Sequence, residues 1–146
     1  MISINKIIDG ISEALNKEFG DTYEIYTEKI EQGLKEPCFS IVLLQPSINQ
    51  FLGQRYYRKN LFCVYYFPAS KEAKSECFDV EERLMNALEY ISIDSELIRG
   101  TDMRGEMTDE VLSFMVSFNL FTKKEAIIKP SMESMRQSTG VRKENE

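Results

Sequence analysis

The amino-acid sequence predicts an α+β domain, with a single, mostly antiparallel sheet of about five strands and two helices packed on one face. Two stretches repeat apolar residues at helical spacing, and several shorter stretches alternate with the period of a strand. The composition, 42% hydrophobic and 29% charged, is that of a globular protein. The predicted elements follow one another in the order α-β-β-β-α-β-β.

A chain of 146 residues fits one domain with a continuous core. We expect residues 1–125 to form that domain. Residues 126–146 end in a polar stretch and should form a partly flexible C-terminal tail. Because the tail also carries Ile127, Ile128 and Met132, it needs a place to bury them, and it is a candidate arm between subunits.

Two helices are predicted, over residues 3–19 and 70–92, with Ser3 and Ser70 as their N-caps. Gly20 ends the first helix. The apolar stripe of the first helix consists of Ile4, Ile7, Ile8, Ile11, Leu15 and Phe19. The stripe of the second consists of Cys77, Val80, Leu84, Ala87, Leu88 and Ile91.

Three strands are expected between the helices. Residues 23–30 alternate weakly, as an edge strand does, and residues 38–45 are nearly all apolar, as in a central strand. Pro46 is expected to end the central strand, after which residues 47–53 form a connection. Residues 51–68 form the longest strand, beginning within the end of that connection.

The last two strands are predicted over residues 97–107 and 111–123, with a turn at residues 108–110. Two glycines in the first of these strands allow a bend or a bulge. The second strand alternates clearly. It places Leu112, Phe114, Val116, Phe118 and Leu120 on one face and Ser113, Ser117 and Asn119 on the other.

The longest strand carries more apolar surface than two helices can cover. From Leu61 onward both of its faces are apolar, so both need cover. The helices supply one cover, and a loop, the tail or another protein chain must supply the other. The uncovered sheet face is therefore a candidate surface for assembly.

Charge and composition exclude several classes of function. The net charge of −6 and the pI near 4.9 argue against a protein that grips nucleic-acid phosphates. The chain has no histidine, and its three cysteines are widely spaced, as expected for small core residues in a reducing compartment. No apolar run reaches the roughly 20 residues that span a bilayer, so we expect no membrane segment and a cytoplasmic chain.

Residue patterns predict no catalytic, cofactor-binding or metal-binding site. The acids Asp102, Glu106, Asp109 and Glu110 could hold a divalent ion, but a solvated hairpin accounts for them better. No glycine-rich loop leads from a strand into a helix, as phosphate binding would require.

The start of the longest strand mixes cations with aromatic residues. This composition is found in platforms for single-stranded nucleic acid, but also in protein interfaces, which we favour in so acidic a chain. We expect contacts with subunits or partners at Phe51, Arg55, Tyr57 and Arg58 and, in the tail, at Ile127, Ile128 and Met132.

Three stretches resemble the phage tail terminator family of tailed phages, prophages and phage-tail-like particles of Gram-positive bacteria. They are EIYTEKIEQGLKEPCFSIVLL (24–44), QFLGQRYYRKNLFCVYYFP (50–68) and IRGTDMRGEMTDEVLSFMVSFNLF (98–121). The resemblance extends over about residues 4–123.

The resemblance implies a non-enzymatic virion protein, assembled in the host cytoplasm, that forms a ring, usually a hexamer, on the head-proximal end of the tail tube. Its partners would be other copies of itself, the tail tube protein, and sheath and head-completion or connector proteins. Such a ring stops tube polymerisation and provides the head-joining surface. DNA would pass through an acidic lumen without specific binding.

Three alternatives remain at this stage. A neck or head-completion protein of the same particle would have a similar composition and a different partner. A monomeric adaptor would use the uncovered sheet face for one partner. A metal-dependent nuclease would require an ion that the acids above hardly support.

Overall fold

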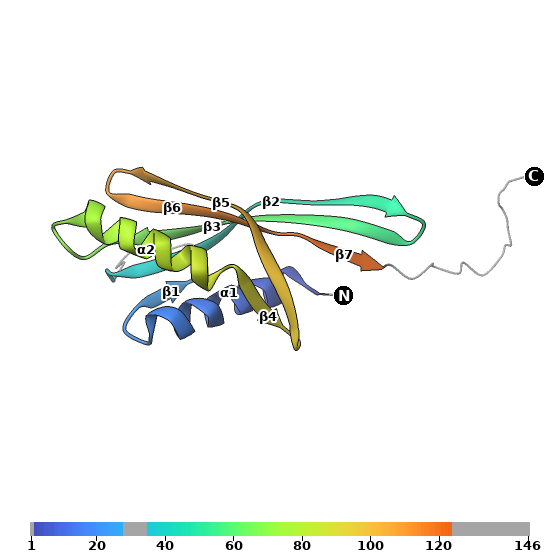
Figure 1. Ribbon diagram of the computed structural model, residues 1–146, viewed down its shortest axis with the longest axis horizontal. Coiled ribbons are helices and arrows are strands. Elements are labelled where there is room, and N and C mark those ends of the chain that lie inside the picture. Colours follow the sequence, from blue (N-terminus) through green and yellow to red (C-terminus); the bar gives the residue numbers. More distant parts are fainter. Residues whose placement is uncertain (1, 28–34, 124–146) are drawn as a thin grey trace, which may run out of the picture.

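The computed structural model describes residues 2–27 and 35–123, in which two helices lie on one face of a curled, seven-stranded sheet (Figure 1). The predicted α+β class is confirmed, with a larger sheet than expected. The elements are α1 (Ile4–Phe19), β1 (Glu24–Tyr26), β2 (Cys38–Leu52), β3 (Arg55–Phe67), α2 (Ala73–Ala87), β4 (Tyr90–Ile93), β5 (Glu96–Thr108), β6 (Val111–Phe118) and β7 (Leu120–Lys123).

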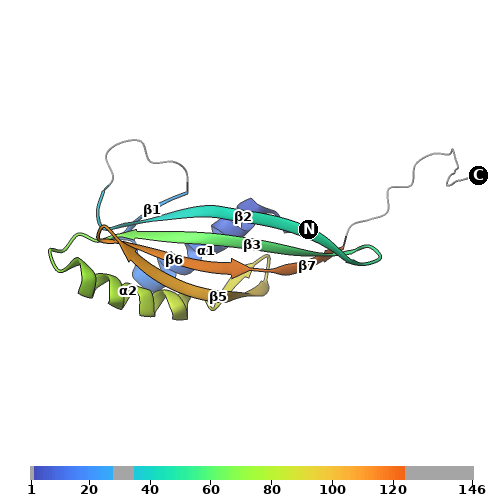
Figure 2. The same cartoon turned by 90° about the horizontal axis from the view of Figure 1, so that it is seen from above.

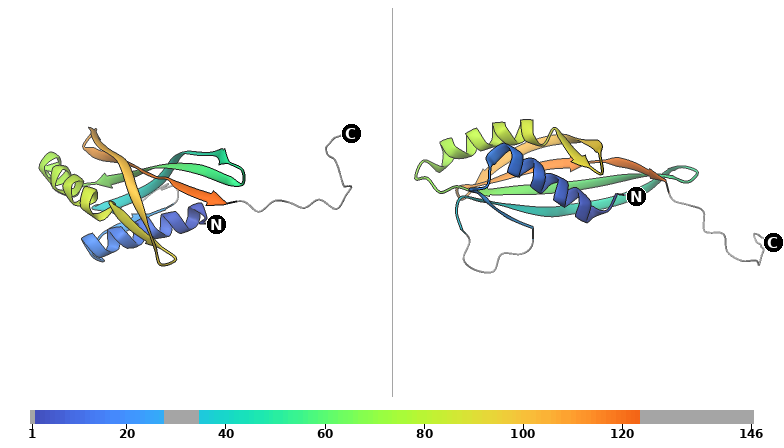
Figure 3. Two further views of the ribbon diagram at one scale, coloured as in Figure 1. Left: turned by 45° about the vertical axis from the view of Figure 1, so that its right-hand side comes forward. Right: turned by 90° about the horizontal axis from the view of Figure 1, so that it is seen from below.

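The sheet is mixed, with the strand order β1-β2-β3-β6-β5-β4 and with β7 beside the first half of β3. Strand β1 runs parallel to β2, and all the other pairs are antiparallel. Seen from below, both helices lie across the same side of the sheet (Figure 3). The prediction of two helices on one face is therefore confirmed.

Helix α1 forms as its sequence predicts. The hydroxyl of Ser3 accepts a hydrogen bond from the Lys6 amide at 3.2 Å, which satisfies one of the free donors of the first turn. The helix ends at Gly20, whose φ of +84° is one that residues with a side chain rarely adopt. At Gly10 an added Cβ would lie 3.1 Å from the side chain of Ile93, so this glycine allows α1 to pack closely on β4.

The second helix is shorter than predicted. It ends at Ala87, and Tyr90–Ile93 form β4, which pairs with the beginning of β5. The two residues between these strands, Asp94 and Ser95, both have positive φ, as in the tight turns that join hairpin strands. The hairpin therefore replaces the last predicted turns of the helix.

Ser70 does not take the predicted N-cap position of α2, which belongs to Glu72. The hydroxyl of Ser70 instead accepts a hydrogen bond from the Glu72 amide at 2.8 Å. The Glu76 carboxylate accepts hydrogen bonds from the amides of Ala69 and Ser70 and from the hydroxyl of Tyr66. One side chain thus joins β3, the following loop and the first turn of the helix.

Strand β2 continues through Pro46, where the sequence predicted its end. Pro46 pairs with Asn60, and the strand runs on to Leu52. Strand β1 covers only Cys38–Ser40, so at Pro46 the outer edge of β2 has no neighbour among the described residues. The missing amide of proline removes no ladder hydrogen bond at a free edge, which is why the strand tolerates it.

Strand β5 bends, as its glycines predicted. Its register shifts between Thr101 and Arg104, and Asp102 has a φ of +53°. At Gly100 an added Cβ would lie 2.2 Å from the Leu88 carbonyl oxygen. The bend directs the first half of β5 away from β6 and toward β4.

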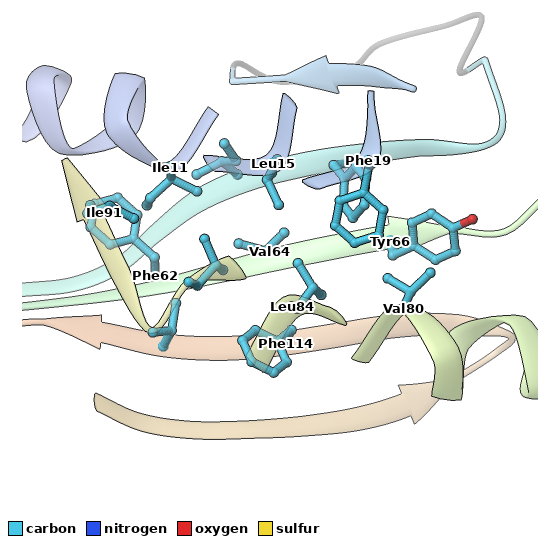
Figure 4. Packing of buried hydrophobic residues seen from close by; sticks show 14 of the residues in the cluster. Ile11, Leu15, Phe19, Phe62, Val64, Tyr66, Val80, Leu84, Ile91 and Phe114 are labelled. Atoms are coloured by element: carbon cyan, nitrogen blue, oxygen red, sulfur yellow. The ribbon is translucent and has the colours of Figure 1, made fainter. Parts of the chain in front are cut away.

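The core lies between the helices and the covered face of the sheet (Figure 4). It joins α1 and α2 to the inward side chains of β2, β3 and β6. Its largest fully buried members are Tyr66, Phe39, Phe62, Phe114, Phe118, Ile7, Ile11, Leu15, Leu84, Leu88, Ile91 and Leu112. The alternation predicted for β6 is confirmed, because Leu112, Phe114, Val116 and Phe118 are all buried.

Candidate interaction surface

Strands β2, β3 and β7 extend beyond the helices and form an arm at one end of the molecule (Figure 2). We define the arm as residues 45–60 and 120–123. Its first two strands pair from Pro46 with Asn60 to Leu52 with Arg55, and β7 adds a third strand alongside residues 55–58. Here β3 has a strand on each side, whereas the helices do not extend over its outer part.

Aromatic side chains gather on the arm. Phe121 pairs with Tyr57 across β7 and β3, with ring centroids 4.9 Å apart, and its centroid is 5.3 Å from that of Phe51. The Arg55 guanidinium lies over the Phe121 ring at 5.3 Å. We call Phe51, Arg55, Tyr57 and Phe121 the arm cluster. Phe51 and Phe121 are 56% and 52% exposed, whereas phenylalanine side chains usually pack in the core of a protein.

Every charged residue of the arm is a cation: Arg55, Arg58, Lys59 and Lys123. The Lys59 ammonium group lies 6.0 Å from the centre of the Tyr57 ring. The whole chain has 24 acidic residues against 18 basic ones, so the arm is opposite in charge to the rest of the protein. Exposed aromatic rings beside arginine are the composition of interface hot spots.

Arg58 lies on the other side of the arm from Arg55. Its side chain is only 7% exposed, and its guanidinium donates a hydrogen bond to the Ile2 carbonyl oxygen, just before α1. Successive strand residues point to opposite faces, and Arg58 falls on the face covered by the helices. The structure thus brings Phe51, Arg55 and Tyr57 together and places Arg58 beneath them.

Phe121 was not among the residues singled out from sequence. The period-two pattern of residues 111–123 placed it with Ser113, Ser117 and Asn119, which gave it the appearance of an isolated aromatic on a polar face. The informative signal was its position opposite Tyr57, which depends on strand pairing. The other predicted contacts, Ile127, Ile128 and Met132, lie outside the described residues, as does the rest of the C-terminal tail.

The sheet face opposite the helices continues from the arm toward β1 (Figure 2). Along β3, Phe62, Val64 and Tyr66 are buried under the helices, so the residues between them point the other way. We call this side the open face. Its apolar side chains are Val42, Leu61, Cys63, Tyr65, Phe67 and Met115, with Ser40, Ser113 and Ser117 beside them.

The open face is partly buried by its own neighbours. Cys63 is 1% exposed, Tyr65 and Phe67 are half-buried, and Val42 is 38% exposed. Burial raises the pKa of the Cys63 thiol, so the thiol stays protonated at neutral pH. A protonated, buried thiol is a poor nucleophile, and this cysteine is a packing residue.

The acids considered for metal binding are spread along a hairpin. Asp109 and Glu110 form the turn between β5 and β6, both with positive φ, and Asp102 sits at the bulge of β5. In the part of the chain that the structure describes, no three His, Cys, Asp or Glu side chains are grouped to hold a metal ion. The predicted turn at these residues is confirmed.

A surface hollow of about 620 Å³ lies between α1, the end of α2 and β4, and its lining includes Glu13, Lys17, Glu18, Tyr90 and Leu97. The paired groups around it serve packing: Arg83 binds the Glu18 carboxylate at 3.0 Å and lies 4.3 Å over the Phe19 ring. Within residues 2–27 and 35–123, no helix is long and apolar enough to cross a membrane.

An α+β domain whose exposed aromatic residues gather on a cationic arm has the surface composition of the class of proteins that bind other proteins. The comparison with known families makes this class specific. The family described as phage tail terminator protein matches residues 6–130, and the chain belongs to that family. No curated protein matches the chain significantly. The chain is therefore a structural component of a phage tail that associates with other tail components.

Proposed function

We propose that this chain forms a closed ring, a hexamer as the family resemblance implies, on the head-proximal end of the completed tail tube. The ring stops tube polymerisation and provides the surface to which head-completion or connector proteins and, in a sheathed tail, the sheath attach. Its role is steric and non-enzymatic. It assembles in the cytoplasm of the bacterial host and remains in the virion or tail-like particle.

The observation that carries this proposal is the exposed arm cluster in a chain that belongs to a tail family. When a partner covers large aromatic rings that are exposed to water, their burial lowers the free energy of the complex. The open face supplies a second apolar surface beside the arm. A ring needs two different patches on each subunit, and these surfaces provide candidates for contacts with the tube and between subunits.

The roles of the predicted contact residues follow from their positions. Phe51, Arg55 and Tyr57 contact a neighbouring protein directly, because the arm presents them at its surface. Arg58 supports that contact from the buried side, because its hydrogen bond to the Ile2 carbonyl oxygen holds the arm to the chain just before α1. Ile127, Ile128 and Met132 of the tail are proposed as further contacts between subunits.

The acidic body of the chain suits a channel for DNA. Away from the arm, acids outnumber basic residues by more than they do in the whole chain, because every charged residue of the arm is basic. Like charge keeps the phosphate backbone from adhering, so DNA passes through the lumen without specific binding. Tight DNA binding that does not weaken as salt is raised would contradict this part of the proposal.

The proposal is tested by growing tail tubes in the presence of the protein. Purified tail tube protein from the same genome is polymerised with and without the chain, and tube lengths are measured by negative-stain electron microscopy. We expect shorter tubes with added density at one end, in a ring of fixed subunit number. Tubes of unchanged length that carry no added density would overturn the proposal.

A matched pair of variants makes the tube assay specific for the arm. Tyr57→Asp places a charge in the arm cluster and should weaken capping, whereas Leu97→Asp changes a residue that is 70% exposed on the body and should leave capping unchanged. Equal capping by both variants would show that the arm cluster makes no contact in the ring or with the tube.

A further inference from the structure

Helix α2 exposes apolar residues on the side that faces away from the core. Phe78 and Met85 are 52% and 41% exposed, whereas Cys77, Val80 and Leu84 are buried on the inner side. Glu82 lies four residues after Phe78 and three before Met85, so the three side chains are neighbours on one face of the helix. We call Phe78, Glu82 and Met85 the α2 stripe.

The α2 stripe is negatively charged. The exposed acids Asp79 and Glu82 lie between Phe78 and Met85, whereas the Glu81 carboxylate lies against Gly105 of β5. The one cation in this interval, Arg83, is bound to Glu18 of α1. Lys74 precedes the stripe by one turn. The stripe thus has the same construction as the arm cluster, two exposed apolar residues with charges beside them, but the sign of the charge is opposite.

The arm and α2 lie at opposite ends of the long axis of the molecule (Figure 1). The view from above shows the same separation (Figure 2). The two surfaces therefore cannot cover each other within one chain. A contact between them joins two copies head to tail, and such a heterologous contact generates a ring if the rotation between copies closes.

We propose that the arm cluster of one copy docks on the α2 stripe of the next copy. Phe51 and Phe121 cover Phe78 and Met85, and the aromatic rings suit the polarisable sulfur of methionine. Arg55 and Lys59 approach Glu82 and Asp79, so opposite charges surround the apolar contact. This inference rests on the proposed ring and specifies the contact that closes it.

Charge complementarity selects a second copy as the occupant. The cationic arm is complementary in charge to an acidic surface, and another copy of this chain, with its net charge of −6, provides one. The arrangement also disfavours other pairings between copies, because two arms repel each other and so do two α2 stripes. The contact is therefore directional, as a ring of identical subunits requires.

Two variants that each damage one surface test the contact by mixing. Phe121→Asp damages the arm, and Phe78→Asp damages the stripe; both positions are exposed, so the fold should persist, which urea unfolding checks. We expect each variant alone to be monomeric by light scattering at concentrations where the unaltered chain forms rings. Mixed in equal amounts, they should form a one-to-one dimer and nothing larger, because one contact has both surfaces intact and the other has both damaged.

A charge exchange provides a second measurement that does not depend on apolar burial. Arg55→Glu and Glu82→Arg should each raise the dissociation constant of the contact at least tenfold in 50 mM salt. The two changes combined in one chain should recover most of that loss. Leu97→Asp, a change at an exposed residue of the body, should have no effect.

The outcomes separate this inference from the proposed function. If Phe121→Asp and Phe78→Asp each still form rings that cap tubes, the arm-to-helix contact is overturned and the terminator role stands. If the unaltered chain assembles only on tubes, the same variants are compared by counting labelled subunits at tube ends, and counts equal to those of the unaltered chain would overturn the contact. An unaltered chain that neither self-associates nor binds tubes would overturn both proposals.

Discussion

Strands β2 and β3 each run through two regions of opposite character. In the body, residues 61–66 of β3 are paired on both sides, and the side chains that face the helices, Phe62, Val64 and Tyr66, are completely buried. In the arm, residues 55–60 of the same strand carry cations and tyrosines, and most of the facing part of β2 is exposed. The pairing continues without interruption from one region to the other, apart from a register shift near Gln45.

This difference shows that the helices, rather than the strands, decide which residues become core. Where α1 and α2 cover the sheet, aromatic residues are buried and stabilise the fold. Where the strands pass beyond the helices, aromatic residues of the same kind remain at the surface and are available to a partner. Substitutions in the body should therefore change stability, and substitutions in the arm should change assembly.

The largest expected effect is on the stability of the body. Phe114→Ala empties a fully buried site between β6 and the helices, and large-to-small changes of this kind cost about 3–5 kcal/mol. Phe121→Ala, on the neighbouring strand of the arm, should cost about 1 kcal/mol or less because the ring is half exposed. Urea unfolding followed by circular dichroism measures both. Equal losses would show that the arm belongs to the cooperative core.

Two arginines of β3 sharpen the comparison at the base of the arm. Arg58→Ala removes a buried guanidinium and its hydrogen bond to the Ile2 carbonyl and should lower the free energy of unfolding by about 2 kcal/mol. Arg55→Ala, three residues earlier on the opposite face, should change it by about 0.5 kcal/mol or less, because Arg55 is exposed. Chemical denaturation of the two variants measures the difference. A larger loss for Arg55 would mean that the two faces of the arm are wrongly assigned.

A pH titration probes the body end of β2. Burial, followed by the nearby carboxylates of Glu36 and Glu24, raises the pKa of the Cys38 thiol to about 11. An unfolded thiol has a pKa of about 8.5 and loses its proton first, so stability is complete below that pH and falls as pH rises toward 11. At about 1.4 kcal/mol per pH unit, we expect a loss of roughly 2–3 kcal/mol over this range. Cys38→Val should flatten this part of the profile, and an identical profile in the variant would contradict the assignment.

Much of the body could be predicted from sequence because its patterns are local. The helical spacing of Ile7, Ile11 and Leu15 fixes the buried face of α1, and Ser3 fixes its start. The strict alternation from Leu112 to Phe118 fixes the buried face of β6. Each of these patterns lies within one helix or one strand, so it can be recognised without knowing which elements pack against it.

The arm could be predicted only in part, because its structure depends on distant neighbours. Alternation places Arg55 and Arg58 on opposite faces, but which face the helices cover is set by tertiary packing. Proline is excluded from the middle of a central strand but tolerated in an edge strand. At Pro46, β2 is an edge strand because β1 ends at Tyr26, and that ending could not be predicted from the residues around Pro46. Phe121 joins the arm cluster through its pairing with Tyr57, which follows from the pairing of β3 with β7.

The smallest expected effect concerns the turns, where arm and body use different residues. The arm turns at Gly53, with φ of +56°, whereas the body turn at Asp109 and Glu110 holds two residues with side chains at φ of +50° and +62°. Glycine adopts this conformation without the clash that a Cβ creates, at the cost of more freedom in the unfolded chain. Glu110→Gly should therefore stabilise the body by about 0.5 kcal/mol, measured as a rise in melting temperature. A loss of stability in Glu110→Gly would show that the Glu110 side chain makes a contact that stabilises the protein by more than the strain at its positive φ costs. The reverse exchange, Gly53→Ala, should strain the arm turn and weaken ring assembly, while the free energy of unfolding of the body stays nearly unchanged.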